Sequence, residues 1–422
     1  AYTAISIEEA VRFLDETPVH TTARYGGYVS QGWVDPGIEI RGSESESLLS
    51  EGFGVLQKQN FSVFPLEVFA SEDGTRFSVE VVATRLDSPS GLAAAPDGRL
   101  FVTERVGRVR VVQDGVLRSE PALTLPEAST EGFVGLFSIT LHPDFERNHL
   151  LYLVYTMSQP DAGLVSWIVR YREVSDTLAE AAVLVNGIPD GATPGGIKIR
   201  FGPDGKLYIA VRDRLLAPRG PDGAARTAAQ DLASLNGKIL RLNDDGTSPD
   251  DNPFHSPLFS FGHRSVVGFD WHPVNGDLWA IEQGPVGSDE LNRIESGLNY
   301  GWPLTESAQI SLGIETPLLL FSPSADPSDG SFYTGHELPA FQNDFFFGAV
   351  RGMHIHRVRF DHTSPGRILG DERLLVERFG RIRCIVTGSD GALYFCTNNR
   401  SYQSASAPND DRILRLLPVG GP

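Results

Sequence analysis

Short runs in which hydrophobic and polar residues alternate recur along the chain, and a tight-turn sequence precedes each of them. In FGPDGKLYIAV (201–211), Leu207, Ile209 and Val211 alternate with other residues after a Pro-Asp-Gly turn. Such alternation predicts a half-buried β-strand, and Pro, Asp and Gly favour the turn of a hairpin. The same arrangement recurs at APDGRLFV (95–102), HPDFERNHLLYLVY (142–155), HPVNGDLWAI (272–281), PSDGSFY (327–333) and GSDGALYF (388–395).

Six copies of one turn-and-strand unit predict an all-β fold. Their spacing leaves room for one four-stranded blade per copy, so we predict a six-bladed β-propeller over residues 77–422. In this interpretation each turn belongs to the outer hairpin of a blade. The last strand, DRILRLLPV (411–419), is expected to pair with RFSVEVVA (76–83), because closing the ring leaves no exposed edge. A long β-sandwich and a double barrel are the alternative architectures.

Residues 1–76 lack this alternation. Ser6 and Glu9 form a capping-box pattern that predicts the start of a helix, and Gly-rich and Ser/Glu-rich sequence follows. We interpret this part as an N-terminal extension packed on the main domain.

The composition is that of an acidic globular protein. The 422 residues carry a formal net charge of -18, and only four of the 36 cationic residues are Lys. This balance argues against general binding to nucleic acid or anionic membranes, although a local Arg pocket can still hold an acidic small ligand. No apolar run reaches the length of a membrane-spanning helix.

The two cysteines, Cys384 and Cys396, lie symmetrically about Asp390 in one predicted hairpin. A cross-strand disulfide is therefore feasible, and two buried free thiols are the alternative. A disulfide would favour an exported protein, either secreted or periplasmic, although no presequence is seen.

The segment WAIEQGPVGSDELNRIESGLNYGWP (279–303) is the richest in candidate chemistry. A strand ending at Glu282 runs into a Gly-Pro turn, which the acidic pair Asp289 and Glu290 follows. Carbonyl and carboxylate oxygens gathered on one loop are the ligands that Ca²⁺ prefers. A turn with solvated acidic residues is the simpler alternative.

This segment resembles the signature of the glucose/sorbosone dehydrogenase family. The family consists of soluble quinoproteins that bind pyrroloquinoline quinone (PQQ) and Ca²⁺ on a six-bladed propeller. Further stretches that carry the resemblance are GLAAAPDGRLFVTERVGRVRVV, GLFSITLHPDF, GGIKIRFGPDGKLYIAV, LNGKILRLNDDGTSPDDNPF, SFGHRSVVGFDWHP and GRIRCIVTGSDGALY. Together they cover nearly everything after residue 77.

The resemblance implies a cofactor site. Backbone carbonyls of Gly284 and Pro285 are expected to hold Ca²⁺. From the acidic residues of the same loop, we also expect Asp289 to be a metal ligand. Arg351, Arg381 and Arg383 are expected to hold the carboxylates and quinone of PQQ. Three cations that converge on one cavity are costly unless an anion fills it; surface salt bridges are the alternative role for each arginine.

Four departures from the family pattern fall where cofactor and substrate should meet. Thr193 stands in the position of the His that takes the sugar hydroxyl proton, and a Thr hydroxyl is no base near neutral pH. Phe133 replaces an expected Gln, Ser265 replaces an expected Asn, and Arg212-Asp213 replaces Gly-Asp. The catalytic part of the site is therefore expected to be altered.

His354 and His356 are the histidines that can replace the missing base. They alternate in RGMHIHRVRF, so they share one strand face close to Arg351, and either can point into the central cavity. Ordinary packing is the alternative, and it is also what we expect for His142, His263 and His272.

Three functions remain open from the sequence. The first is a PQQ- and Ca²⁺-dependent oxidoreductase acting on a sugar or a related alcohol. The second is a hydrolase, lyase or isomerase that has lost PQQ and uses Ca²⁺ as a Lewis acid on an anionic substrate. The third is a non-catalytic binding propeller.

Overall fold

A computed structural model of the protein describes residues 67–129, 134–189, 196–213, 228–284, 287–305, 309–400 and 410–419, and the backbone of four short strands before them. These four are β1 (Thr21–Ala23), β2 (Gly27–Val29), β3 (Gly32–Val34) and β4 (Ile38–Ile40). β1 pairs with β4 and β2 pairs with β3. The chain divides into two compact units, residues 1–68 and 69–422. The helix expected at Ser6 and Glu9 lies outside the described residues, and the packing of the N-terminal extension stays a prediction.

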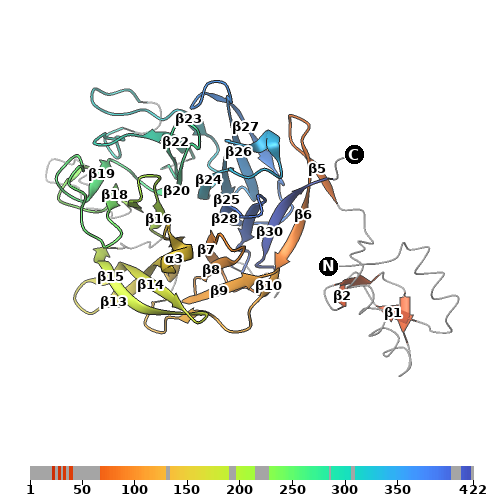
Figure 1. The fold of residues 1–422 in the computed structure, drawn as a ribbon. Helices are drawn as coiled ribbons and strands as arrows, with labels where there is room; N and C mark the ends of the chain where they lie inside the picture. Colours follow the sequence, from red (N-terminus) through yellow and green to blue (C-terminus); the bar gives the residue numbers. More distant parts are fainter. Residues whose placement is uncertain are drawn as a thin grey trace. The chain divides into compact units, whose positions relative to one another are not determined.

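The second unit is a six-bladed β-propeller, as predicted (Figure 1). The first blade contains β7 (Pro89–Ala94), β8 (Leu100–Glu104), β9 (Arg108–Gln113), β10 (Val116–Leu117) and β11 (Leu123–Thr124). The second contains β12 (Leu136–Leu141), β13 (Leu150–Gln159), β14 (Gly163–Val174) and β15 (Thr177–Pro189), with helix α3 (Phe145–Asn148) between β12 and β13. The third contains β16 (Lys198–Phe201), β17 (Leu207–Val211), β18 (Lys238–Leu242) and β19 (Leu258–Phe261), with the 3-10 helix η1 (Ala228–Gln230).

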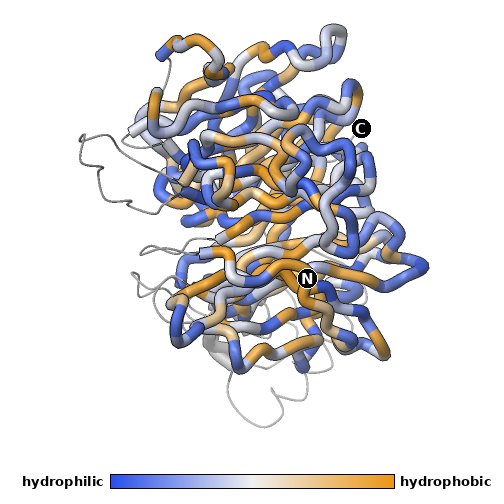
Figure 2. The backbone as a smooth tube through the Cα atoms, turned by 90° about the vertical axis from the view of Figure 1, so that its left-hand side faces the viewer, coloured by the Kyte–Doolittle hydropathy of each residue, from blue (hydrophilic) through white to orange (hydrophobic). Residues whose placement is uncertain are grey.

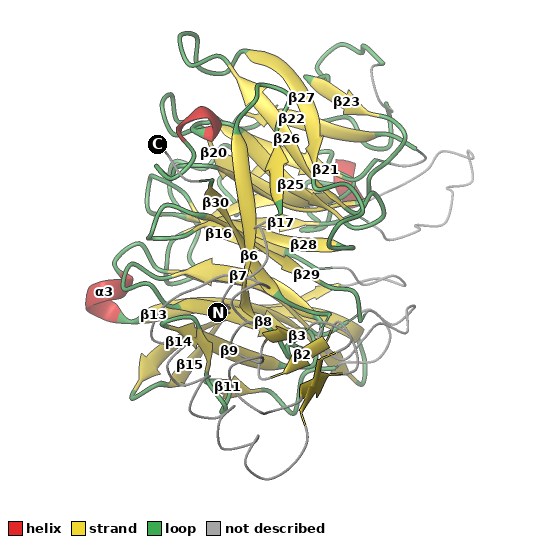
Figure 3. Cartoon of the chain, turned by 90° about the vertical axis from the view of Figure 1, so that its right-hand side faces the viewer, coloured by secondary structure: helices red, strands yellow, loops and turns green. Residues whose placement is uncertain are grey.

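The fourth blade contains β20 (Val266–Trp271), β21 (Leu278–Glu282), β22 (Asp289–Ile294) and β23 (Leu319–Phe321). The fifth contains β24 (Pro327–Phe332), β25 (Phe345–Ala349), β26 (His354–Phe360) and β27 (Ile368–Leu374), with the 3-10 helix η2 (Pro339–Phe341). The sixth contains β28 (Ile382–Thr387), β29 (Leu393–Thr397), β30 (Ile413–Pro418), β6 (Arg76–Ala83) and β5 (Val68–Ala70). The side view in Figure 3 shows how little of the described chain is helical. No helix among the described residues is long and apolar enough to cross a membrane.

The first strands of neighbouring blades lie against one another. They line a central cavity on the axis of the ring, which we call the channel. Hydrophobic stretches of the chain lie mostly inside the unit and hydrophilic stretches mostly at its periphery (Figure 2). The blades pack through these apolar faces: Phe101 of β8, for example, meets Phe145 of α3 edge-on with ring centroids 5.7 Å apart. Burial of these faces is the main contribution that holds the blades together.

The repeated turns occupy equivalent places in different blades. Asp97, Asp204 and Asp390 each follow a first strand and accept a hydrogen bond from the backbone N–H two residues later, at 3.1, 3.1 and 3.2 Å. These turns join the first strand to the second, which makes them inner hairpins. The prediction that they are outer hairpins is therefore wrong. The first strand of each blade lies at the channel, and the later strands lie progressively further from it.

One of the six copies is not a turn. PSDGSFY forms strand β24, and all six residues of that strand are buried. Gly330 of this strand allows the backbone to pack closely against the Phe345 ring, because a Cβ there would lie 2.5 Å from that ring. The connection that follows is longer and contains η2.

The ring closes as predicted. β30 pairs with β6 in an antiparallel ladder in which Leu416 faces Val79. Within the same sheet Cys384 and Cys396 face each other on β28 and β29 and form a disulfide. The alternative of two free thiols is therefore wrong for this structure.

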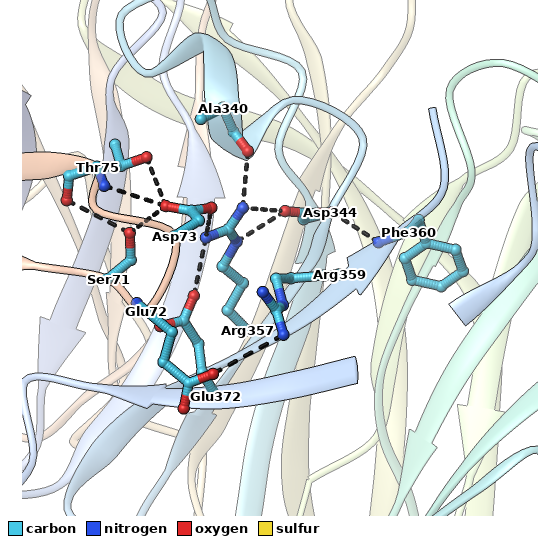
Figure 4. Close-up of polar contacts among 10 residues, drawn as sticks. All are labelled: Ser71, Glu72, Asp73, Thr75, Ala340, Asp344, Arg357, Arg359, Phe360 and Glu372. Atoms are coloured by element: carbon cyan, nitrogen blue, oxygen red, sulfur yellow. Dashed lines mark hydrogen bonds and ion pairs between the residues drawn. The ribbon is translucent and has the colours of Figure 1, made fainter. Parts of the chain in front are cut away.

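A buried arginine ties the closing blade to its neighbour (Figure 4). Arg357 of β26 contacts Asp73, in the turn between β5 and β6, with Nη1 2.7 Å from Oδ2. The same guanidinium pairs with Glu372 at 2.8 Å and with Asp344 through Nε at 2.7 Å. Three carboxylates around one buried cation leave an excess of negative charge here, and burial raises the pKa of Asp344 to about 6.

Candidate active site

Most of the described residues that the sequence analysis predicted for the site lie at the same end of the ring. Neighbouring strands of a blade are antiparallel, so each first strand begins where each second strand ends. Ser265 directly precedes β20, Gly284 follows β21, Arg351 follows β25 and Arg381 directly precedes β28. Arg383 is the second residue of β28 and lies one step further along the channel. We call this end of the ring the Gly284 end.

The guanidinium groups of Arg351, Arg381 and Arg383 make no hydrogen bond or ion pair with any described residue. Nε of Arg381 is buried without a partner. Burial lowers the pKa of both Arg381 and Arg383, and the Asp326 carboxylate opposes this shift at both. Arg351 is exposed, and Arg381 and Arg383 are half-buried. Like charges without partners repel one another, so this cluster is suited to an anionic ligand.

Gly284 and Ser288 lie close together, and we call these two residues the Gly284 turn. A Cβ on Gly284 would overlap the carbonyl oxygen of Ser288, so only glycine fits here. The Gly284 carbonyl accepts a hydrogen bond from Nη1 of Arg264 at 2.7 Å, and the same Nη1 donates to the Gln283 carbonyl at 2.7 Å. A metal ion at the Gly284 carbonyl would therefore lie close to a fixed positive charge. Pro285 lies outside the described residues.

Asp289, the first residue of β22, is fully buried. Its carboxylate accepts hydrogen bonds from Oγ of Ser324 at 2.9 Å and from the backbone N–H of Ala325 at 2.8 Å. Burial raises the pKa of Asp289, and the nearby backbone N–H of Gly284 opposes this shift. The two hydrogen bonds occupy both carboxylate oxygens, and the metal-ligand role of Asp289 stays a prediction.

Ser265 and Arg212, two of the departures from the family pattern, contact each other. Nε of Arg212 donates to Oγ of Ser265 at 2.6 Å, and its Nη2 donates to Oε1 of Gln283 at 3.2 Å. Gln283 in turn hydrogen-bonds Asp326 through Nε2. The substitutions thus form one polar chain that crosses three blades.

His263 is buried beside this chain and has a structural role, as expected. Its Nε2 lies 2.8 Å from Oγ of Ser260, and its Nδ1 lies 3.2 Å from Oε2 of Glu282. The arrangement resembles a Ser-His-acid triad, yet Ser260 and His263 are both 0% exposed. A substrate cannot reach them. Glu282 also accepts the backbone N–H groups of Arg264 and Ser265, so it fixes the start of β20.

His354 and His356 lie on β26, the third strand from the channel, and neither lines the central cavity. The prediction that either points into that cavity is therefore wrong. His356 stacks on Phe347 with ring centroids 4.6 Å apart. His354 donates from Nδ1 to the Gly352 carbonyl at 2.9 Å, and its Nε2 lies 3.2 Å from Nδ1 of His356. The pair thus supports the turn that carries Arg351; a catalytic role for either histidine stays a prediction.

The central cavity itself holds charges that sequence reasoning missed. It has a volume of about 200 Å³ and is lined by first strands, including Lys198, Arg200 and Asp329. Nζ of Lys198 lies 3.6 Å from Oδ1 of Asp329, and burial lowers the pKa of this lysine. The sequence signal for these charges is the presence of polar residues in first strands that are otherwise apolar.

Comparison with known proteins identifies the family. The family model for glucose / sorbosone dehydrogenase matches residues 86–405. The chain belongs to this family. It is 31% identical to aldose sugar dehydrogenase YliI of Escherichia coli over 374 residues, which are 82% of this chain and 97% of the relative. It is 33% identical to quinoprotein glucose dehydrogenase B of Acinetobacter calcoaceticus over 56% of this chain and 54% of the relative.

A solved aldose sugar dehydrogenase has a similar fold. The PQQ-bound form of aldose sugar dehydrogenase from Streptomyces coelicolor superposes with a TM-score of 0.68 at 32% identity, covering 81% of this chain and 98% of that chain. The six-bladed propeller expected from the resemblance is thus confirmed.

Three of the predicted site residues lie outside the described residues. They are Thr193, Phe133 and Pro285. Their roles stay predictions, and so does the altered catalytic site.

The described residues fit the two family cofactors to different degrees. PQQ carries three carboxylates, and the three unpaired arginines supply matching charge. No group of three or more His, Cys, Asp or Glu in the described part of the chain is placed to hold a metal ion. A Ca²⁺ ion would therefore depend on backbone oxygens such as that of Gly284.

Proposed function

We propose that the protein is a PQQ-dependent dehydrogenase that oxidises an aldose or a related sugar alcohol at the Gly284 end of the propeller. One observation carries the proposal: Arg351, Arg381 and Arg383 gather at this end without a partner among the described residues. The relatives named as aldose sugar dehydrogenase and quinoprotein glucose dehydrogenase support the substrate class.

The protein contributes binding and orientation. Arg381 and Arg383 project from the start of β28 and Arg351 from the turn after β25, so the three cations reach an anion from two blades. The Gly284 carbonyl, and by family resemblance that of Pro285, would hold Ca²⁺ beside it. Bound PQQ supplies the acceptor for the two electrons and the hydrogen that the sugar loses.

The proton of the sugar hydroxyl needs a separate acceptor. Thr193 stands where the family places a histidine, and a neutral Thr cannot accept this proton efficiently. We therefore propose weak glucose oxidation even with both cofactors present, with a deficit of about 10²- to 10⁴-fold relative to a site that has the base.

The test adds PQQ and CaCl₂ to the purified protein and follows the quinone absorbance before and after an aldose is added. Binding followed by slow reduction supports the proposal, and Thr193→His should then speed reduction. If the protein does not bind PQQ with or without Ca²⁺, the proposal is overturned and a Ca²⁺-assisted hydrolase, lyase or isomerase becomes the better candidate.

We also propose a secreted or periplasmic location. The Cys384–Cys396 disulfide supports it, because disulfides persist in oxidising compartments. Fractionation of the source cells would show the location; recovery from the cytosol with reduced thiols would contradict it.

A further inference from the structure

We propose that Asp289 is a positioning residue that joins the Gly284 turn to the turn carrying Arg351 (residues 350–353). The position of the metal part of the site and that of the quinone part then depend on the same side chain. The two turns belong to different blades, the fourth and the fifth. The inference rests on the proposed function for what the two turns bind, and on the contacts below for how they are connected.

On one side, Asp289 holds the Gly284 turn. The backbone N–H of Gly284 stabilises the ionised Asp289 carboxylate and so opposes the rise in pKa that burial causes there. A side chain on Gly284 would overlap the carbonyl oxygen of Ser288, the residue directly before Asp289. The position of the Gly284 carbonyl therefore depends on this acceptor.

On the other side, Asp289 holds the chain that supports Arg351. It accepts the N–H of Ala325 at 2.8 Å and the hydroxyl of Ser324 at 2.9 Å. The Ala325 carbonyl in turn accepts the backbone N–H groups of Arg351 at 3.2 Å and Gly352 at 3.0 Å. Two consecutive hydrogen-bonded steps thus connect Asp289 to the backbone of Arg351.

The carboxylate is required because the hydroxyl of Ser324 and the N–H of Ala325 both donate to it. Asp289→Asn keeps the size of the side chain but directs an NH₂ group at N–H donors, which leaves buried groups unpaired. Both turns share the acceptor, so both should loosen together.

Asp270 offers a matched control. It accepts the same two kinds of donor, the hydroxyl of Ser331 at 2.8 Å and the backbone N–H of Phe332 at 2.9 Å, at the opposite end of β24, and it also pairs with Arg200 at 2.6 Å. Asp270→Asn therefore removes a comparable carboxylate without touching either turn.

The first experiment is hydrogen–deuterium exchange of the two variants without any ligand. We expect Asp289→Asn to speed exchange about 10-fold in peptides that contain Gly284 and in peptides that contain Arg351 and Gly352. Asp270→Asn should leave both unchanged. Unchanged exchange at Arg351 and Gly352 in Asp289→Asn would overturn the inference, whatever the protein binds.

The second experiment measures PQQ affinity in EGTA, where only the arginines act. We expect Asp289→Asn and Arg351→Gln each to weaken binding about 10-fold, and the double variant to be no weaker than the stronger single variant. Additive losses would contradict the route through Arg351. If the unmodified protein binds no PQQ, the proposed function fails, while the exchange measurement still decides the connection between the turns.

Discussion

The guanidinium of Arg264 donates a hydrogen bond to the Gly284 carbonyl, with Nη1 2.7 Å from the oxygen. The oxygen expected to bind Ca²⁺ is thus already in contact with a cation. We predict that Arg264→Gln tightens Ca²⁺ binding in the absence of PQQ by about 10-fold, because it removes a like charge next to the metal. Calorimetric titration with CaCl₂ checks this. Weaker binding would mean that Arg264 chiefly holds the turn in shape.

Arg381 should lower the stability of the free protein and increase its affinity for PQQ. Its buried Nε lacks a partner, so Arg381→Gln should raise the midpoint of urea unfolding of the free protein. The same change should weaken PQQ binding about 10- to 100-fold, because a charge-assisted contact is lost. Arg415→Gln is the control, since Arg415 pairs with Glu80 on the surface at 2.7 Å. If Arg381→Gln lowers stability and leaves PQQ affinity intact, the arginine has a structural role.

Asp326 should oppose cofactor binding. Its carboxylate acts electrostatically on both Arg381 and Arg383, so it competes with an incoming carboxylate. We expect Asp326→Asn to tighten PQQ binding about 3- to 10-fold, while the amide oxygen still accepts from Gln283. An absorbance titration at two salt concentrations checks this, and the gain should shrink at high salt. A loss of affinity would point instead to a direct role for Asp326 in holding the ligand.

The cluster around Arg357 should make stability depend on pH. Burial raises the pKa of Asp344 to about 6, so the folded state binds a proton that the unfolded state lacks between pH 3.8 and about 6. This carboxyl group therefore contributes stability that grows as the pH falls, by about 1 kcal/mol between pH 7 and pH 5. The difference in unfolding free energy between the protein and Asp344→Asn should grow accordingly. A difference that stays flat across this range would show that Asp344 titrates as an ordinary carboxyl group.

The fold could be predicted from sequence because its determinants are local. The alternation in residues 201–211 and the turn at Asp204 recur in other blades with the same hydrogen bond. The error at PSDGSFY arose because Gly330 has two possible uses, in a turn or beneath a neighbouring ring. Only the position of Phe345, on another strand, decides between them.

The site was predictable only in part. Family-like motifs in the sequence pointed to Arg351, Arg381 and Gly284, and these residues do lie at the same end of the ring. The contacts of Asp289 with Ala325 and of Arg212 with Ser265 join residues 36 and 53 positions apart on different blades. Such contacts depend on how blades pack, which local patterns do not specify.

The closing sheet has a consequence for biosynthesis. It takes β5 and β6 from one end of the propeller sequence and β28, β29 and β30 from the other. While residues 413–418 are still inside the ribosome, the nascent chain carries five complete blades. The edges of β6 and β29 that will pair with β30 are then unpaired. These edges are templates for pairing with other chains. Translation pauses or truncations before Ile413 should thus make the protein prone to aggregation and dependent on chaperones until the final strand is inserted.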